Sequence, residues 1–117
     1  MRVATANATP TSLTLDGTTA GIPVPTGKTM SLFFMIVAAK TGTGNAEVFW
    51  RQITVRNSAG VLTITAVNTI GTDVTALGTG SPPAFSAAGT SLDIKVTGIA
   101  ATAINWVATV SGVEVAI

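Results

Sequence analysis

The sequence predicts an all-β fold, either an antiparallel β-sandwich or a jelly-roll-like barrel of about seven to eight strands. Short segments of alternating apolar and polar residues are separated by turn-forming residues at intervals of about 8 to 12 residues. Threonine, whose branched β-carbon favours strands over helices, occurs 21 times in the 117 residues. No segment has the apolar spacing of a helix. The links between the expected strands are short, which predicts antiparallel pairing.

The chain divides into two expected parts, an extended N-terminal arm over residues 1–11 and a single β-sandwich domain over residues 12–117. The arm consists largely of Ala, Thr and Asn, closes with Pro10 and has no periodic apolar face. Arms of this kind often reach a neighbouring subunit. We therefore expect Arg2, Val3 and Pro10 to contact another chain.

The expected domain begins with two short segments. Leu13 and Leu15 alternate with polar residues before Gly17, which predicts a short strand followed by a turn. Pro23 and Pro25 come next, and a proline donates no hydrogen bond to a neighbouring strand. This second segment is therefore an edge strand or a loop.

The strongest strand pattern covers residues 29–40, and it is apolar on both faces. Large apolar residues fill both sets of alternate positions: Met30, Leu32, Phe34 and Ile36 on one face, and Phe33, Met35 and Val37 on the other. An antiparallel sheet normally turns one face to water, so the second face needs a cover. Either the chain's own loops or a second subunit supplies it.

Residues 46–56 and 61–67 predict a hairpin around a turn at residues 57–60. Trp50 lies on the more polar face of the first of these strands and is therefore the better of the two tryptophans for a subunit contact. The polar residues on its face are Gln52, Thr54 and Arg56.

Arg51 lies among the inward-facing residues of the same strand. A buried arginine needs a partner, and Glu47 or Asp93 is the expected one. Alternatively, the side chain extends to the rim of the core, where its guanidinium group meets water.

The remaining strands follow from shorter patterns. Residues 68–80 predict a weak strand and a long loop, and residues 84–87 a short strand anchored by Phe85. Residues 92–97 alternate strictly and predict a half-buried strand.

The last long strand begins at Ile104 and places Trp106 in the core. After Gly112 the apolar positions shift to Val113 and Val115. This change of phase predicts a bulge or bend.

The composition excludes most catalytic chemistry. The chain has no His, Cys or Tyr, so imidazole bases, thiolate nucleophiles and their metal sites are absent. Two candidates remain, a Ser with a Lys base and a pair of carboxylates, and neither has a supporting motif. The carboxylates occur singly along the chain: Asp16, Glu47, Asp73, Asp93 and Glu114. We expect no enzymatic activity, no cofactor and no bound metal.

The charge content predicts association with other protein chains. Only 9% of the residues are charged, against about 25% in an ordinary soluble domain, and the net charge is +1. The six basic residues are scattered, which disfavours nucleic acid. The longest apolar run, Leu32 to Ala39, is far shorter than the roughly 20 residues of a membrane span, and no secretory signal is recognisable. We expect a homo-oligomer made in a host cytoplasm.

Strand and turn segments from Ala8 onward resemble a β-rich structural module of tailed-phage virion proteins, including capsid decoration or cement proteins and tail-fibre or tailspike domains. The segments that carry the resemblance are Ala8-Thr9-Pro10-Thr11, Leu13-Thr14-Leu15-Asp16-Gly17, Ile22, Val24-Pro25, Gly27-Lys28-Thr29, Ile36-Val37-Ala38-Ala39, Phe49-Trp50-Arg51, Ile94-Lys95-Val96-Thr97-Gly98, Ile104-Asn105-Trp106-Val107-Ala108 and Val113-Glu114-Val115. The resemblance implies a structural role in the virion and a trimer. In larger fibre proteins the module is one piece of the chain, whereas here we expect a free-standing one.

These observations favour a capsid cement or decoration protein that trimerises on the shell and binds the major capsid protein. The expected trimer contact is formed by Phe33, Met35, Val37 and Trp50, with residues 1–11 on the capsid or a neighbour. The alternative is a tail-fibre or tailspike module that binds a host surface glycan through exposed loops. A hydrolase acting on a polysaccharide is the third class, and it rests only on the presence of carboxylates.

Overall fold

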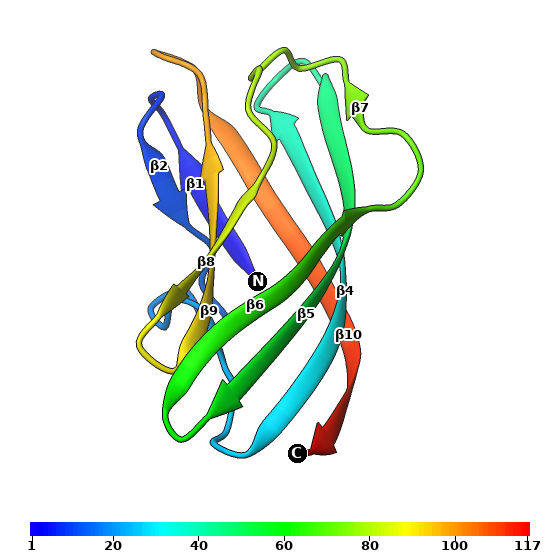
Figure 1. Ribbon diagram of the computed structural model, residues 1–117. Helices are drawn as coiled ribbons and strands as arrows, with labels where there is room; N and C mark the ends of the chain where they lie inside the picture. Colours follow the sequence, from blue (N-terminus) through cyan, green and yellow to red (C-terminus); the bar gives the residue numbers. More distant parts are fainter.

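A computed structural model describes all residues, 1–117, and shows two antiparallel sheets packed face to face (Figure 1). The larger sheet has six strands: β1 (Arg2–Thr5), β10 (Ile104–Ala116), β4 (Lys28–Lys40), β5 (Ala46–Ser58) and β6 (Val61–Thr69) in that order, with β7 (Val74–Thr75) beside β5. The smaller sheet contains β2 (Pro10–Ser12), β3 (Ile22–Pro23), β8 (Ala84–Ala88) and β9 (Ser91–Thr97). The predicted all-β sandwich is confirmed. Four of the ten strands have only two to four residues, which explains why fewer were expected.

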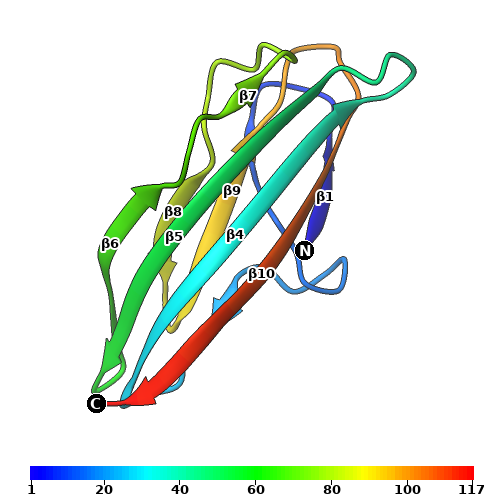
Figure 2. The ribbon, with the colours of Figure 1, turned by 90° about the vertical axis from the view of Figure 1, so that its right-hand side faces the viewer.

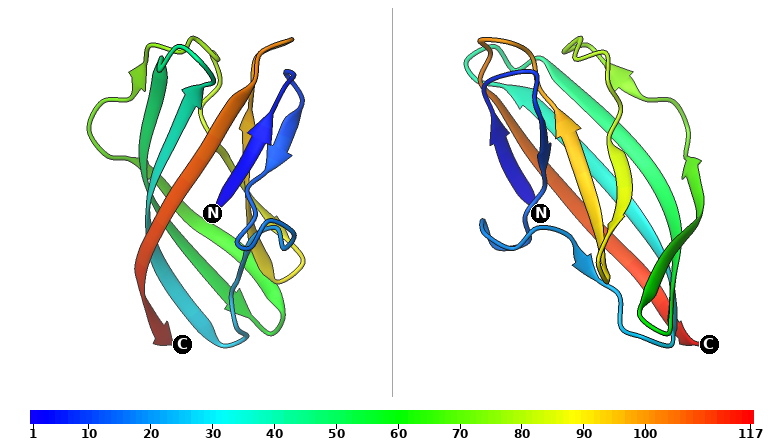
Figure 3. Two further views of the ribbon diagram at one scale, coloured as in Figure 1. Left: turned by 180° about the vertical axis from the view of Figure 1, so that it is seen from behind. Right: turned by 60° about the vertical axis from the view of Figure 1, so that its left-hand side comes forward.

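The smaller sheet is built around β9. β8 pairs with one side of β9, and β2 and β3 pair with different parts of its length. Residues 14–21 leave the sheet between β2 and β3 and return to it, as the views from other sides show (Figure 3). β3 contains Pro23, in agreement with the expected edge position.

Three long strands, β10, β4 and β5, form the centre of the larger sheet (Figure 2). Their pairing runs without interruption from Ile104 opposite Lys40 to Ala116 opposite Lys28. Of the two expectations at Gly112, a bulge or a bend, the bulge is therefore wrong, because the register does not shift there. Gly112 serves another purpose, because a Cβ atom there would collide with the Ser31 carbonyl oxygen and with the Leu32 side chain.

Gly112→Ala is expected to lower the free energy of unfolding by about 1–2 kcal/mol, because the added methyl group forces β10 and β4 apart. Gly17→Ala is not a suitable control, since Gly17 has a positive φ of 89°. Ser111→Ala, at the neighbouring exposed position, is suitable. Urea denaturation of the two variants tests the expectation, and equal midpoints for both would contradict it.

The first eleven residues are not a free arm, and this expectation is corrected. β1 pairs with β10, and β2 pairs with β9, so the segment contributes an edge strand to each sheet. The amino group of Met1 donates to the Ala108 carbonyl oxygen at 2.9 Å. Edge strands of this kind depend on backbone hydrogen bonds, which need no apolar periodicity, and the sequence pattern therefore did not reveal them.

The core lies between the sheets and consists of 17 buried apolar residues. Trp106 is 1% exposed, and its indole N–H donates to the Thr5 hydroxyl group at 3.0 Å. Phe34 and Phe85 join the two sheets with ring centroids 5.3 Å apart. The predicted core position of Trp106 is confirmed. No helix is present that could cross a membrane.

Candidate functional site: the outer face of the larger sheet

The outer face of the larger sheet carries a contiguous apolar surface. It faces the viewer in Figure 2, in front of the smaller sheet. We call it the outer apolar patch, and it consists of Phe33, Met35, Val37, Val48, Trp50, Val74 and Val107.

Strand register brings these side chains into rows across the sheet. In the first row Val107, Val37, Val48 and Val74 lie side by side on four strands. Neighbouring residues directly opposite each other in antiparallel strands have Cβ atoms about 4.5–5.5 Å apart, so the four side chains form a continuous ridge.

The second and third rows continue the patch. Met35 lies opposite Trp50 on one side and Thr109 on the other. Phe33 is 50% exposed and lies between Ser111 and Gln52. The patch therefore extends from the middle of the three longest strands toward the end at which β4 connects to β5.

A polar band bounds the patch. The Gln52 side-chain amide donates to the Ser31 and Thr54 hydroxyl groups, each at 2.8 Å, and accepts from Asn68 at 2.6 Å. Arg2 lies at the rim, opposite Val107. No charged side chain lies inside the patch, so desolvating it costs little electrostatic energy.

The structure shows where each predicted contact residue lies. Phe33, Met35, Val37 and Trp50 share the outer face, as expected, and no loop of the chain covers Phe33 or Met35. Of the three arm residues, Arg2 and Pro10 are exposed, whereas Val3 packs against the core.

Sequence reasoning missed three members of the patch. Val48 and Val107 alternate with inward residues, so the period of two places both on outward faces, but it does not show that strand register brings them beside the expected contact residues. Val74 follows no pattern, because it reaches the face through pairing of the short strand β7 with β5.

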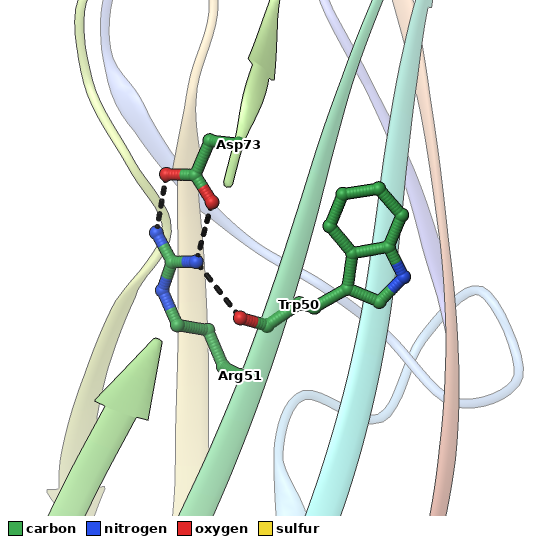
Figure 4. A network of polar contacts seen from close by, with 3 residues as sticks. All are labelled: Trp50, Arg51 and Asp73. Carbon is green, nitrogen blue, oxygen red and sulfur yellow. Dashed lines mark hydrogen bonds and ion pairs between the residues drawn. The ribbon is translucent and has the colours of Figure 1, made fainter. Parts of the chain in front are cut away.

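A partly buried ion pair holds the loop before β7 against the sheet (Figure 4). The Arg51 guanidinium group donates to both carboxylate oxygens of Asp73, at 2.7 and 2.9 Å, and to the Trp50 carbonyl oxygen at 2.9 Å. Its central carbon lies 5.5 Å from the centre of the Phe49 ring. The hydrogen bonds from Arg51 lower the pKa of Asp73 below its ordinary value, against the opposing effect of desolvation.

Neither expected partner of Arg51 binds it. Glu47 is buried and accepts instead from the backbone N–H and hydroxyl group of Thr79. Asp93 lies 3.8 Å from the ammonium group of Lys95. The expectation that Glu47 or Asp93 pairs with Arg51 is therefore wrong. The loop after β6 places Asp73 beside the guanidinium group instead.

Two carboxylates, Glu47 and Asp73, line a cavity of about 380 Å³ together with polar loop residues such as Thr79 and Ser81. Both carboxylates already accept two hydrogen bonds from the protein. A general acid needs a raised pKa, whereas that of Asp73 is lowered. The arrangement therefore suits loop anchoring, and of Thr79 and Ser81 only Ser81 has a hydroxyl group that makes no hydrogen bond within the protein.

Asp16 organises the turn between β2 and β3. Its carboxylate accepts from the backbone N–H and hydroxyl groups of Thr18 and Thr19. The backbone hydrogen bond from Thr19, followed by that from Thr18, holds the pKa of Asp16 well below its ordinary value. This is the behaviour of a turn-forming aspartate. Nowhere does the fold bring three or more carboxylates together as a metal site.

The fold and the patch define an all-β sandwich with an uncovered apolar sheet face. No family model and no curated protein matches the sequence. Among solved structures, the crystal structure of the Acinetobacter phage vB_ApiP_P1 tailspike protein is similar, with a TM-score of 0.39 and 12% identity over 98% of this chain. This chain covers 20% of the tailspike chain. A likeness of this size concerns the arrangement of strands alone.

Proposed function

We propose that the chain is a non-enzymatic structural protein of a phage particle. In this proposal it is a capsid cement or decoration protein that trimerises on the shell and binds the major capsid protein. The observation that carries the assembly part is the outer apolar patch. The assignment to a phage particle rests on the resemblance of the strand and turn segments to virion modules.

The patch has the composition of a subunit contact. Its centre is aromatic and aliphatic, with Trp50, Phe33 and Met35 together, and its rim is polar. Protein interfaces are enriched in aromatic residues and methionine and depleted in charge at their centres. Monomeric proteins rarely leave a contiguous apolar surface of this kind open to water.

The backbone beneath the patch supports the same role. β10, β4 and β5 each have 13 residues and pair along almost their whole length. A surface on paired central strands loses little conformational entropy on binding, since its backbone is already ordered. Repeated use in a symmetric shell favours such a preorganised surface.

Phe33→Glu is expected to convert the oligomer to a monomer at micromolar concentration, because the contact would have to bury an unpaired carboxylate. Light scattering coupled to size-exclusion chromatography measures the mass, and circular dichroism checks the fold. Val61→Glu is the matched control, since Val61 is 65% exposed at the start of β6 and lies outside the patch. A wild-type monomer, or an unchanged oligomer in Phe33→Glu, would contradict the proposal.

The position in the particle has its own test. Quantitative mass spectrometry of purified particles gives the copy number of this chain relative to the major shell protein. A copy number comparable to that of the shell protein supports a cement or decoration protein. A few copies per particle would support a tail location, and absence from particles would overturn the virion assignment.

The alternative, a tail-fibre or tailspike module that binds host glycan, is favoured by one observation. The cavity is lined by Ser81, whose hydroxyl group makes no hydrogen bond within the protein. Binding of the purified protein to host cells, lost in Ser81→Ala but retained in Phe33→Glu, would replace the cement proposal with this one.

A further inference from the structure

The larger sheet has an open edge along the second half of β10. β1 covers β10 only from Ile104 to Val107, and the hydrogen bonds between Met1 and Ala108 end this pairing. β10 itself continues to Ala116. Figure 2 shows β1 beside the upper half of β10 only.

The backbone N–H and C=O groups of successive residues in β10 point alternately toward β4 and away from it. This alternation identifies the groups that have no partner strand. Even-numbered residues of β10 turn their N–H and C=O groups away from β4, since those of Ala108 bond to Met1. Odd-numbered residues bond toward β4, and the N–H of Ile117 continues this with the Gly27 carbonyl oxygen. Both backbone groups are consequently without a strand partner at four positions: Val110, Gly112, Glu114 and Ala116.

This edge lacks most of the features that normally prevent strand addition. Natural edge strands are protected by proline, bulges, short length or inward charges. β10 contains no proline and no register shift. Its one charged residue, Glu114, lies on the inward side of the strand beyond the core, where the Lys28 ammonium group lies 3.6 Å from its carboxylate and offsets its charge. The opposite edge, β6, pairs with β5 through a bulge at Thr54. The edge formed by β10 is therefore better suited to the addition of another strand than the edge formed by β6.

We propose that the open edge of β10 binds β10 of a second copy of this chain, antiparallel, about a two-fold axis at Val113. The register follows from the positions of the open groups. Centring the axis on Gly112 places Ala116 opposite Ala108, whose groups already bond to Met1. Centring it on Glu114 places two carboxylates directly opposite each other, which is unfavourable.

An axis at Val113 avoids both problems. It does not require Ala108, which already bonds to Met1, and it does not place the two Glu114 carboxylates directly opposite each other. Each copy then pairs Val110 with Ala116 and Gly112 with Glu114 of the other, so all four open residues use both backbone groups. Glu114 lies directly opposite a glycine, so the two Glu114 carboxylates are diagonal neighbours and not directly opposite each other. Val113 is 67% exposed in one chain and packs against its own symmetry mate.

The pairing joins two six-stranded sheets into one continuous sheet. Ser111 of each copy lies opposite Val115 of the other on the outer face. The contact uses the edge, whereas the proposed trimer uses the face, so it does not depend on the proposed function. A particle protein with both contacts would link its trimers to one another through two-fold contacts.

Disulfide trapping tests the register, because the chain has no cysteine of its own. Residues directly opposite in a non-hydrogen-bonded antiparallel pair have Cα atoms about 4.5 Å apart, within the range of a disulfide. Val113→Cys is expected to form a covalent dimer under mild oxidation. Ser111→Cys and Val115→Cys are expected to cross-link with each other in an equimolar mixture and much less when each is alone.

Val61→Cys, equally exposed and on the opposite edge, is the matched control. Equal cross-linking of Val113→Cys and Val61→Cys would overturn the edge contact. Equal cross-linking of Ser111→Cys alone and in the mixture would overturn the register.

A charge exchange gives a second, non-covalent test. Val113→Lys and Val113→Glu are each expected to lose the edge contact, since like charges meet at the axis. Mixing the two variants is expected to restore it, as measured by sedimentation velocity. Failure of the mixture to associate more than either variant alone would contradict the proposal. The result is separable from that of Phe33→Glu, because Phe33 lies on the face and Val113 at the edge.

Discussion

Trp106→Ala is expected to lower the free energy of unfolding by about 3–5 kcal/mol, the largest single effect in this protein. Trp106 is the largest fully buried side chain and lies on β10 at the centre of the sandwich. Its removal leaves a cavity between the sheets. It also leaves the Thr5 hydroxyl group without its donor, which loosens β1.

Guanidinium denaturation measures this loss, and Trp50→Ala is the matched control because Trp50 lies on the outer face. Thr5→Val separates the hydrogen bond from the cavity, since it leaves a buried N–H unsatisfied at a cost of about 1–3 kcal/mol. If Trp50→Ala destabilised the monomer as much as Trp106→Ala, the assignment of the two tryptophans to face and core would be wrong.

Asp73→Ala is expected to lower the free energy of unfolding by about 2–3 kcal/mol at neutral pH, because it leaves a buried cation unpaired. The Arg51 side chain is 7% exposed, whereas that of Asp73 is 24% exposed. Contact of Asp73 with water places the effect below that of a fully buried pair. Loss of this ion pair also releases the loop before β7.

The double variant Arg51→Met with Asp73→Ala is expected to be more stable than Asp73→Ala alone. Methionine fills the space beside Phe49 without a charge to solvate. Urea denaturation of both single variants and the double variant gives the coupling energy directly. Additive effects of the two substitutions would show that the pair contributes no coupling.

The same ion pair predicts a dependence on pH. The folded-state pKa of Asp73 is lowered, so its contribution to stability is fully present above the ordinary pKa of aspartate. This contribution is lost as the pH falls through the lowered folded-state value, where the carboxylate becomes protonated. The stability difference between wild type and Asp73→Asn should therefore shrink in acid. A difference that grows as the pH falls would contradict this sign.

The candidate site shows which of its residues the local sequence pattern could predict and which it could not. The alternation of Phe33, Met35 and Val37 with inward residues predicted a shared outer face, and the structure leaves that face uncovered by the chain's own loops. Val74 completes the first row only because a two-residue strand pairs with β5. No periodicity extends over two residues, so that member of the patch had no sequence signal.

The sequence by itself determined the strand class, the inward position of Trp106 and the two-sided apolar character of residues 29–40. All three depend on the alternation of inward and outward side chains along one strand, which neighbouring residues in the sequence are enough to show. Only the tertiary structure decided that residues 1–11 join both sheets, that Asp73 pairs with Arg51, and that β10 ends with an open edge. Those outcomes depend on contacts between distant segments, through backbone hydrogen bonds and loop paths that leave no periodic pattern in the sequence.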